Sequence, residues 1–240
     1  MVFLNRYGLL MKRIMVQKLS YRYPDGTQAL NDISFEVTEN QRVAVIGHNG
    51  SGKSTLLCIL SALLLPTSGI VQINDSNVTH KNKILIRKST GILFSQVEYQ
   101  FIMPDIINDV MLSINNGEDE EKYLQAMDII KQVNLADVAF HHPLSLSSGQ
   151  MKRAALASVL AKNPSVLLLD EPLANLDKPS SDAVINILLQ LTIPIVFATH
   201  SKYLVEHVAQ RIIVLEKGTI VMDDTAKSNK VKKYLQTILT

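Results

Sequence analysis

Residues 47–55, GHNGSGKST, constrain the fold of this chain more than any other segment. They have the spacing G-x-x-x-x-G-K-[ST] and lie between two apolar runs, residues 42–46 and 56–65. The first run predicts a buried strand and the second a helix, which is the setting in which this spacing binds phosphate. We therefore predict a nucleoside triphosphate site rather than a glycine-rich turn without a ligand. The predicted phosphate-binding residues are Gly47, Asn49, Gly50, Ser51, Gly52, Lys53, Ser54 and Thr55.

Charge, cysteine content and apolar runs exclude several classes of protein. The 240 residues carry 24 Lys and Arg against 22 Asp and Glu, so the totals show no bias toward polyanions. Cys58 is the single cysteine, which excludes an internal disulfide and a multi-cysteine zinc site. No apolar run approaches the ~20 residues that span a bilayer. We expect one domain over residues 12–240, with residues 1–11 as an extension that does not resemble a signal peptide.

The remaining pattern alternates strands and helices, as in an α/β domain. Residues 15–45 predict two or three strands. Residues 166–170 and 195–198 are continuously apolar, which is typical of parallel strands covered on both faces. Residues 97–162 predict a helical insertion, and residues 211–222 a closing hairpin.

Two acidic residues and a histidine follow the apolar strands. Asp170 and Glu171 end the run VLLLDE, where carboxylates are costly unless they meet a cation such as Mg²⁺. We expect Asp170 to hold Mg²⁺ together with the Ser54 hydroxyl, and Glu171 to act as general base on the attacking water. A solvated acidic turn is the alternative. His200 ends the next strand and is predicted to hydrogen-bond the γ-phosphate.

A second small-residue turn, LSSGQ, opens the helix predicted from about residue 147. Ser147 and Gly149 expose a hydroxyl and backbone N–H groups at a helix N-terminus, which predicts a second anion site. Ser147 and Gln150 also have the spacing of a capping box. Both interpretations can hold, because a capped N-terminus still presents donors.

The order GHNGSGKST, LSSGQ, LLLDEP, NLD and TH resembles the ATP-binding cassette family over almost the whole chain. The resemblance implies an α/β fold with a P-loop NTPase core, a mostly parallel sheet, an N-terminal antiparallel β-subdomain and an inserted helical subdomain. It implies a head-to-tail dimer that holds two ATP molecules with Mg²⁺. Ser147, Gly149 and Gln150 would lie against the γ-phosphate bound by the partner. Asp177 would lie in the loop that couples the two sites, and Tyr23 would stack on adenine.

Two further segments, YPDGTQALNDISFEV and GILFSQVEYQF, are similar to the cassettes of energy-coupling factor and cobalt-type importers. This similarity implies an ATP-hydrolysing subunit that powers uptake of a vitamin or metal ion. Its partners would be a second cassette, identical or different, and integral-membrane subunits, without nucleic acid. It would be peripheral on the cytoplasmic face of a prokaryotic cell membrane. Residues 96–104 would contact the membrane partner.

One position departs from the importer pattern. Counted from Gly91, Ser95 occupies the place of the glutamine that contacts Mg²⁺, and Gln96 comes one residue late. We favour a bulge that restores Gln96 as a metal ligand over a slower ATPase without it.

Two other functions stay open. A soluble cassette ATPase that acts on DNA or ribosomes is disfavoured, because this chain has neither a long coiled coil nor a second cassette. A degenerate regulatory cassette, indicated by Ser95 and Ser148, is disfavoured by the presence of Glu171 and His200.

Overall fold

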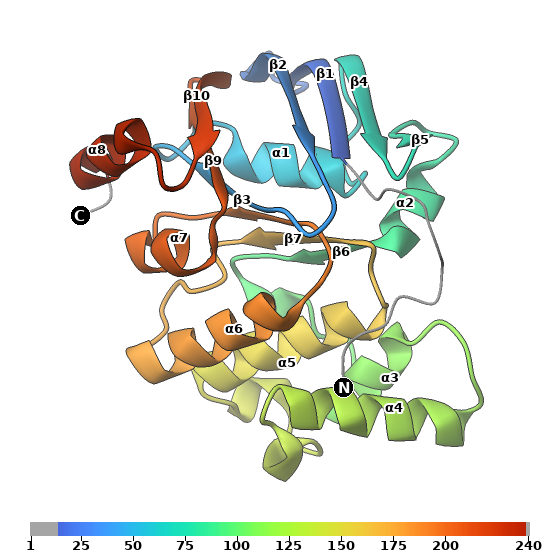
Figure 1. The fold of residues 1–240 in the computed structure, drawn as a ribbon. Helices are drawn as coiled ribbons and strands as arrows, with labels where there is room; N and C mark the ends of the chain where they lie inside the picture. The colour runs from blue at the N-terminus through green and yellow to red at the C-terminus, as the bar shows by residue number, and fades with distance from the viewer. Residues whose placement is uncertain (1–13, 239–240) are drawn as a thin grey trace.

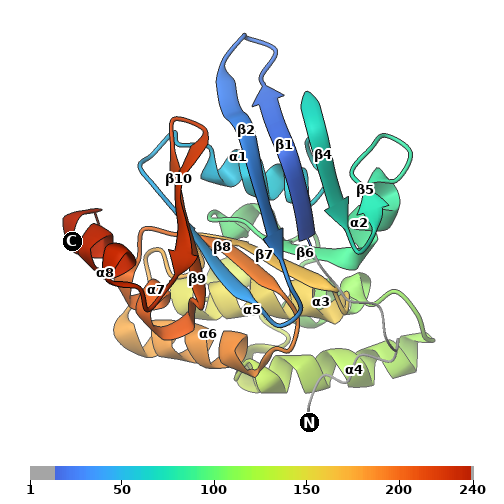
Figure 2. The same cartoon turned by 45° about the horizontal axis from the view of Figure 1, so that its top comes forward.

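A computed structural model describes residues 14–238, so the predicted extension at residues 1–11 lies outside the described residues. The described chain forms two β-sheets that are separated and flanked by helices (Figure 1). Helix α1 (Lys53–Leu60) lies between the two sheets, and α5 (Ser148–Ala161) and α6 (Lys178–Gln190) cover the opposite face of the larger sheet (Figure 2). The predicted α/β class is confirmed.

The larger sheet contains the strands that the continuously apolar runs predict. Its strands in the described residues are β3 (Arg42–Ile46), β6 (Thr90–Leu93), β7 (Val166–Asp170), β8 (Ile195–Ala198), β9 (Arg211–Glu216) and β10 (Thr219–Thr225). They lie in the order β10-β9-β3-β8-β7-β6, and every neighbouring pair except β10–β9 is parallel. Alternation assigns the side chains of β3 to the two faces. Val43 and Val45 join the core beside α1, whereas Ala44 and Ile46 join the core beside α5 and α6.

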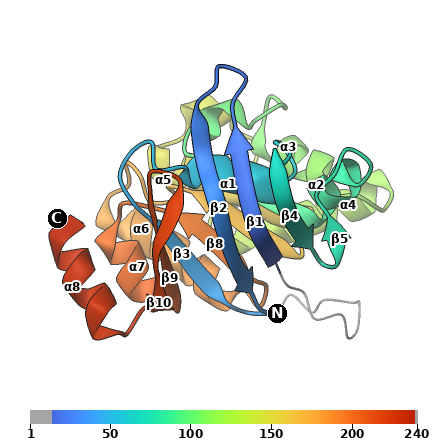
Figure 3. The same ribbon diagram turned by 90° about the horizontal axis from the view of Figure 1, so that it is seen from above.

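The smaller sheet is antiparallel, which confirms the predicted N-terminal β-subdomain. Its strands in the described residues are β1 (Ile14–Arg22), β2 (Gln28–Val37), β4 (Ser68–Ile73) and β5 (Ser76–Asn77). They lie in the order β2-β1-β4-β5, and the sheet lies over α1 when seen from above (Figure 3). At the turn between β1 and β2, the Gly26 N–H donates to the Tyr23 carbonyl over 2.9 Å.

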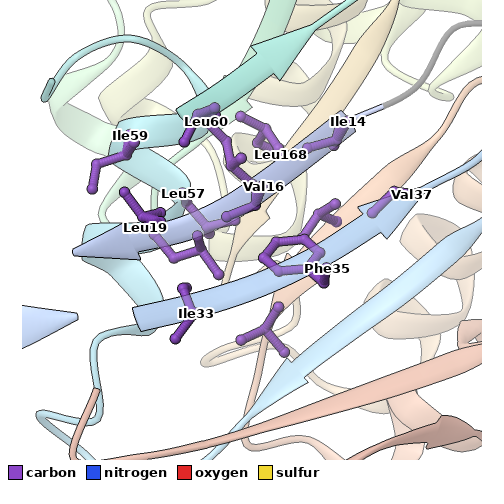
Figure 4. Close-up of a cluster of buried hydrophobic side chains, with 14 of the residues drawn as sticks. Ile14, Val16, Leu19, Ile33, Phe35, Val37, Leu57, Ile59, Leu60 and Leu168 are labelled. Carbon is purple, nitrogen blue, oxygen red and sulfur yellow. The ribbon is translucent and has the colours of Figure 1, made fainter. Parts of the chain in front are cut away.

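The core between the sheets holds α1 in place. Val16 and Leu19 from β1, Phe35 from β2, and Leu57 and Leu60 from α1 are at most 5% exposed and belong to one cluster (Figure 4). Burial of each such side chain is worth about 1.5–3 kcal/mol. This packing fixes the start of α1, and with it the loop that precedes the helix.

The remaining helices extend the molecule at both ends. They are α2 (Lys83–Ser89), α3 (Ile106–Ser113), α4 (Asp119–Gln132), α7 (Lys202–Val208) and α8 (Asn229–Ile238), with short 3₁₀ turns at Val97–Tyr99, Ala136–Val138 and Pro143–Ser145. The pair α3 and α4 lies at one end and α8 at the other in all three views (Figures 1–3).

Helix α5 belongs to two cores. Its Leu156 and Leu160 pack with the larger sheet, whereas Ala154 and Ala157 pack with α3 and α4. The predicted helical insertion at residues 97–162 thus shares α5 with the sheet, and its exact bounds stay a prediction.

The helix after the phosphate loop differs from the predicted residues 56–65. It begins at Lys53 and ends at Leu60, because Ala62 adopts a left-handed conformation with φ of 57°. The N–H groups of Leu63 and Leu64 then donate to the Cys58 carbonyl and close the helix end. The apolar run continues past this end because Leu64 and Leu65 still pack against the core.

Candidate active site

A cavity of about 720 Å³ lies beside the loops that follow β3, β7 and β8, at the N-terminus of α1. Its volume is within the range of small-molecule sites. The predicted site residues that line it are Tyr23, Asn49, Gly50, Gly52, Lys53, Ser54, Thr55, Asp170, Glu171 and His200. The other lining residues are Thr27, Gln28, Ala29, Ser95, Leu173, Ala174, Asn175 and Ser201.

The phosphate loop connects β3 to α1 in a conformation that excludes side chains at its first residue. Gly47 has φ of 151°, and an added Cβ would lie 2.8 Å from Ser51 Oγ and closer still to the Leu215 carbonyl oxygen. Gly47 therefore lies against the Leu215 backbone, and neither Gly47 nor the buried Ser51 lines the cavity.

Lys53 is the positive charge at the cavity. Its Nζ donates to the carbonyl oxygens of Gly47 over 2.8 Å and His48 over 3.0 Å. Burial lowers the pKa of the Lys53 ammonium, while the charges of Glu171 and Asp170 oppose this shift. The loop thus holds the ammonium where an anion entering the cavity would meet it.

Glu171 has the surroundings of a general base. One carboxylate oxygen, Oε2, accepts from Thr199 Oγ1 over 3.1 Å and from the His200 N–H over 3.3 Å. The other oxygen, Oε1, is buried without a hydrogen-bond donor among the described residues. A buried acceptor without a donor is costly unless a water or ligand reaches it. Oε1 is therefore available to bind a water molecule and accept its proton.

His200 joins the lysine and the glutamate. Its Nε2 lies 3.2 Å from Lys53 Nζ and 3.8 Å from Glu171 Oε1. Because an ammonium can only donate, the contact with Lys53 requires a neutral imidazole with its proton on Nδ1. The structure brings these three predicted residues together, although they come from segments far apart in the sequence.

The oxygen donors at the cavity fit Mg²⁺. The carboxylate of Asp170, which is 9% exposed, and the hydroxyl of Ser54 both line the cavity. Within residues 14–238, no group of three His, Cys, Asp or Glu residues could hold a metal ion by itself. The Asp170 carboxylate and the Ser54 hydroxyl match Mg²⁺, which usually keeps waters and binds substrate phosphates in addition to one or two protein ligands.

The predicted bulge does not bring Gln96 to the cavity. Ser95 lines the cavity, whereas Gln96 lines a neighbouring hollow of about 500 Å³. The reason is a clamp made by Gln100, whose side chain accepts from the Phe94 N–H over 2.8 Å and donates to the Ile92 carbonyl over 3.1 Å. These two hydrogen bonds fix the conformation of the loop, in which Ser95 faces the cavity.

The LSSGQ turn forms the predicted capping box. Ser147 Oγ accepts from the Gln150 N–H over 3.3 Å, and Gln150 Oε1 accepts from the Ser147 N–H over 3.0 Å. Gly149 packs directly on α6, because an added Cβ would lie 2.6 Å from Ser180 Cβ. None of these three predicted residues lines the cavity of its own chain.

Asp177 is the N-cap of α6 and lies close to the LSSGQ turn. Its carboxylate accepts from the Ser180 N–H over 3.0 Å, and hydrogen bonds to Ser180 lower the pKa of Asp177. Ser148 Oγ donates to the Asn175 carbonyl over 3.3 Å, and Asn175 lines the cavity. The loop before α6 thus connects the cavity to the LSSGQ turn, although Asp177 itself does not line the cavity.

Three supporting residues were missed from the sequence. Thr199 holds Glu171, Gln100 holds the Ser95 loop, and the buried Lys152 donates to the Ser95 carbonyl over 2.9 Å. Thr199 directly precedes His200, and that adjacency was the available signal. Lys152 gave no signal, because a lysine within a helix is usually on the surface.

A protein-family model described as "ABC transporter" matches residues 30–174. A relative from Methanosphaera stadtmanae, "Energy-coupling factor transporter ATP-binding protein EcfA", is 35% identical over an alignment of 218 residues, and the match covers 88% of this chain and 78% of the relative. The protein EcfA2 of Clostridioides difficile, of the same description, is 38% identical over an alignment of 221 residues, and the match covers 86% of this chain and 77% of the relative.

Solved structures agree with these relatives. CbiO1 of Clostridium perfringens, part of the ABC transporter complex CbiONQ, superposes with a TM-score of 0.81 at 28% identity and covers 95% of this chain and 96% of its own. The dimeric ABC transporter cassette MJ0796 has a TM-score of 0.81 at 27% identity, and the match covers 90% of this chain and 99% of the MJ0796 chain. The same cassette is also known bound to ADP and Pi after hydrolysis. Among residues 14–238, no helix has the length and apolar character needed to cross a membrane.

Proposed function

The chain belongs to the ABC transporter family, and on that premise we propose that it powers the uptake of a vitamin or metal ion by an importer of the energy-coupling factor type. As an ABC ATPase subunit of this type, it uses ATP and Mg²⁺ and works with membrane transporter subunits and an ATPase partner. One observation carries the catalytic part of the proposal. Lys53, His200 and Glu171 converge at the cavity, with His200 within 3.2 Å of one and 3.8 Å of the other.

The geometry assigns a role to each of these groups in hydrolysis. The backbone N–H groups of the phosphate loop and the ammonium of Lys53 bind the β- and γ-phosphates. Glu171 Oε1 accepts the proton of the attacking water, while Thr199 and the His200 N–H hold the other carboxylate oxygen in place. With its proton moved from Nδ1 to Nε2, the His200 imidazole would leave Lys53 and donate to the γ-phosphate. Ser54 and Asp170 would hold Mg²⁺, whose positive charge would offset the negative charge of the phosphates.

A second cassette completes the site in this proposal. Ser147, Gly149 and Gln150 lie outside the cavity of their own chain, yet they present a capped helix N-terminus suited to an anion. A head-to-tail dimer accounts for this separation, because each chain then supplies its LSSGQ turn to the γ-phosphate of the other. The link from Ser148 to Asn175 supports a coupling role for the loop that carries Asp177.

Tyr23 has the support that an adenine platform needs. Its hydroxyl hydrogen-bonds Thr55 Oγ1 over 2.9 Å, and its ring meets that of Tyr21 edge to face with centroids 4.9 Å apart. These two contacts fix the plane of the ring beside the cavity. We assign Tyr23 to stacking on the base.

The membrane partner docks on the apolar surface around residues 96–104 in this proposal. Tyr99 is 80% exposed and lines the hollow together with Gln96. Ile102 is 78% exposed and Leu112 51%, and both line a second hollow that shares Gln100 with the first. Neighbouring exposed apolar side chains mark interaction surfaces. Binding there would keep the cassette peripheral, on the cytoplasmic face of the membrane.

The variant Glu171→Gln tests the proposal, with the exposed Glu206→Gln as a matched control. We expect Mg²⁺-dependent phosphate release to be lost in Glu171→Gln and kept in Glu206→Gln, because the amide cannot accept the proton of the water. The inactive variant should hold ATP and form a stable dimer in size-exclusion chromatography. Parental ATPase activity in Glu171→Gln would show that Glu171 is not the general base.

The regulatory alternative keeps one observation in its favour, the position of Gln96 outside the cavity. A cassette without this ligand would be a slow or inactive partner of a different, active chain. The presence of Glu171 and His200 at the cavity argues against it. Phosphate release by the purified chain, compared with its Glu171→Gln variant, distinguishes the two functions.

A further inference from the structure

Lys152 is a buried cation beneath the active site. It lies on α5 and is 3% exposed. Its Nζ donates to the Ser95 carbonyl over 2.9 Å and to the Glu171 carbonyl over 3.5 Å. Burial lowers the pKa of Lys152, and the charges of Glu98, Glu171 and Asp170 oppose this shift. Both acceptors belong to residues that line the cavity, although Lys152 itself does not.

Folding alone gives little reason for a charge at this position. Taking an ammonium out of water is costly, and backbone carbonyls compensate only part of that cost. Apolar replacements of buried charges are often neutral or stabilising when they fill the same volume. The methionine side chain has nearly the length of lysine and would fill the space beneath Ser95. The benefit of the charge therefore lies in what the ammonium holds.

The residue that it holds has an unfavourable backbone conformation. Glu171 has φ of 47°, in the left-handed region that non-glycine residues rarely adopt. Such conformations persist when surrounding contacts fix them, and they concentrate at functional sites. On one side the Glu171 N–H donates to the Ala198 carbonyl over 2.9 Å, and on the other its carbonyl accepts from Lys152. The two contacts together fix the direction of the carboxylate.

We propose that Lys152 is a positioning residue that fixes Glu171 and the Ser95 loop in working geometry and ties both to the helix carrying the LSSGQ turn. The inference rests on the proposed function, because it concerns the base assigned there. Lys152 lies less than two helical turns from Ser147 and Gly149 on α5. A shift of α5 is therefore transmitted through Lys152 to the base of the same chain, while the LSSGQ turn moves at the nucleotide of the partner.

The test compares Lys152→Met with Lys152→Arg in the full-length protein assembled with its partners. The control is Lys162→Met, at the C-terminal end of the same helix. Lys162 Nζ also donates to two backbone carbonyls, those of Arg87 over 3.2 Å and Thr90 over 3.4 Å, but neither of these two residues lines the cavity. The readouts are kcat, KM for ATP and the midpoint of thermal unfolding.

We expect Lys152→Met to lower kcat at least tenfold while KM for ATP changes less than threefold. Lys152→Arg should recover most of kcat, because it restores a cation with several donors. Lys162→Met should keep parental kcat. Should Lys152→Met fail to fold, Lys152→Gln takes its place under the same criteria.

Three results would overturn the inference: parental kcat in Lys152→Met, no recovery in Lys152→Arg, or an equal loss in Lys162→Met. The proposed function fails separately, when the parental assembly releases no phosphate or when Glu171→Gln is as fast as the parent.

Discussion

The close approach of Gly149 to α6 predicts a specific defect in Gly149→Ala. The added Cβ would lie 2.6 Å from Ser180 Cβ and closer still to Ser180 Oγ. Rotation of the hydroxyl relieves only the contact with Oγ, so α5 and α6 must move apart at this point. Overpacking of this kind costs about 1–3 kcal/mol. Alanine gains at most about 1 kcal/mol over glycine in a helix. With the middle of the overpacking range and the full helix gain of alanine, we expect a net loss of about 1 kcal/mol in the free energy of unfolding, rising to about 2 kcal/mol at the upper end of that range.

Urea unfolding measures this loss, and Ser180→Gly supplies the compensating variant. Glycine at position 180 removes both atoms that the new Cβ would meet and leaves the Ser180 Cα position 3.9 Å away. The double variant should be at least as stable as Ser180→Gly alone. Because displacement of α5 also moves the LSSGQ turn, Gly149→Ala should lower ATPase activity and the double variant should restore it. Equal stability of Gly149→Ala and the parent would refute the described packing of α5 on α6.

Two further predictions concern tyrosines. Tyr23→Ala should weaken the binding of a fluorescent ATP analogue by about 5- to 150-fold, since stacking on a base is worth about 1–3 kcal/mol. Tyr23→Phe should lose only the hydrogen bond to Thr55 and weaken this binding by less than about tenfold. Equal affinity of the parent and Tyr23→Ala would show that Tyr23 does not stack on the base. Burial, with the hydrogen bond and charge of Glu216, raises the pKa of Tyr234 from 10.0 to about 12. The stability that this shift contributes is therefore fully present below pH 10 and is lost as the pH rises through about 12, so unfolding measured over this range should show a smaller decline for Tyr234→Phe than for the parent.

Local sequence signals predicted the parts of the fold that short segments determine by themselves. The phosphate loop, the apolar strands and the Ser147–Gln150 capping box each depend on residues close together in the chain, and the structure has all three elements. Helix α3 was missed although its N-cap was visible in the sequence. Asp105 follows Pro104, and its carboxylate accepts from the Asn108 N–H over 2.9 Å.

Single backbone conformations and side-chain hydrogen bonds decided the features that the sequence did not indicate. The end of α1 depends on the left-handed Ala62, which an unbroken apolar run conceals. The choice of Ser95 over Gln96 at the cavity depends on the Gln100 side chain, whose amide bridges Ile92 and Phe94. Both features depend on one backbone dihedral angle or on the position of one side chain, so spacing counted along the chain could not distinguish the alternatives.

Helix α5 packs in two hydrophobic cores, and this limits the conformational changes that ATP binding and hydrolysis can drive in the proposed function. This helix has 14 residues and is about 21 Å long, and along its length one face packs on the larger sheet while another packs on α3 and α4. Helices α3 and α4 cannot rotate independently of the larger sheet, because α5, on which they pack, also packs on that sheet. Any tilt of α5 must either move Leu156 and Leu160 across the strands of the larger sheet or move the LSSGQ turn at the start of the helix. In the proposed dimer, force applied at the exposed Leu112 on α3 would pass to α5 through the packing between these helices and reach the LSSGQ turn at the partner's nucleotide.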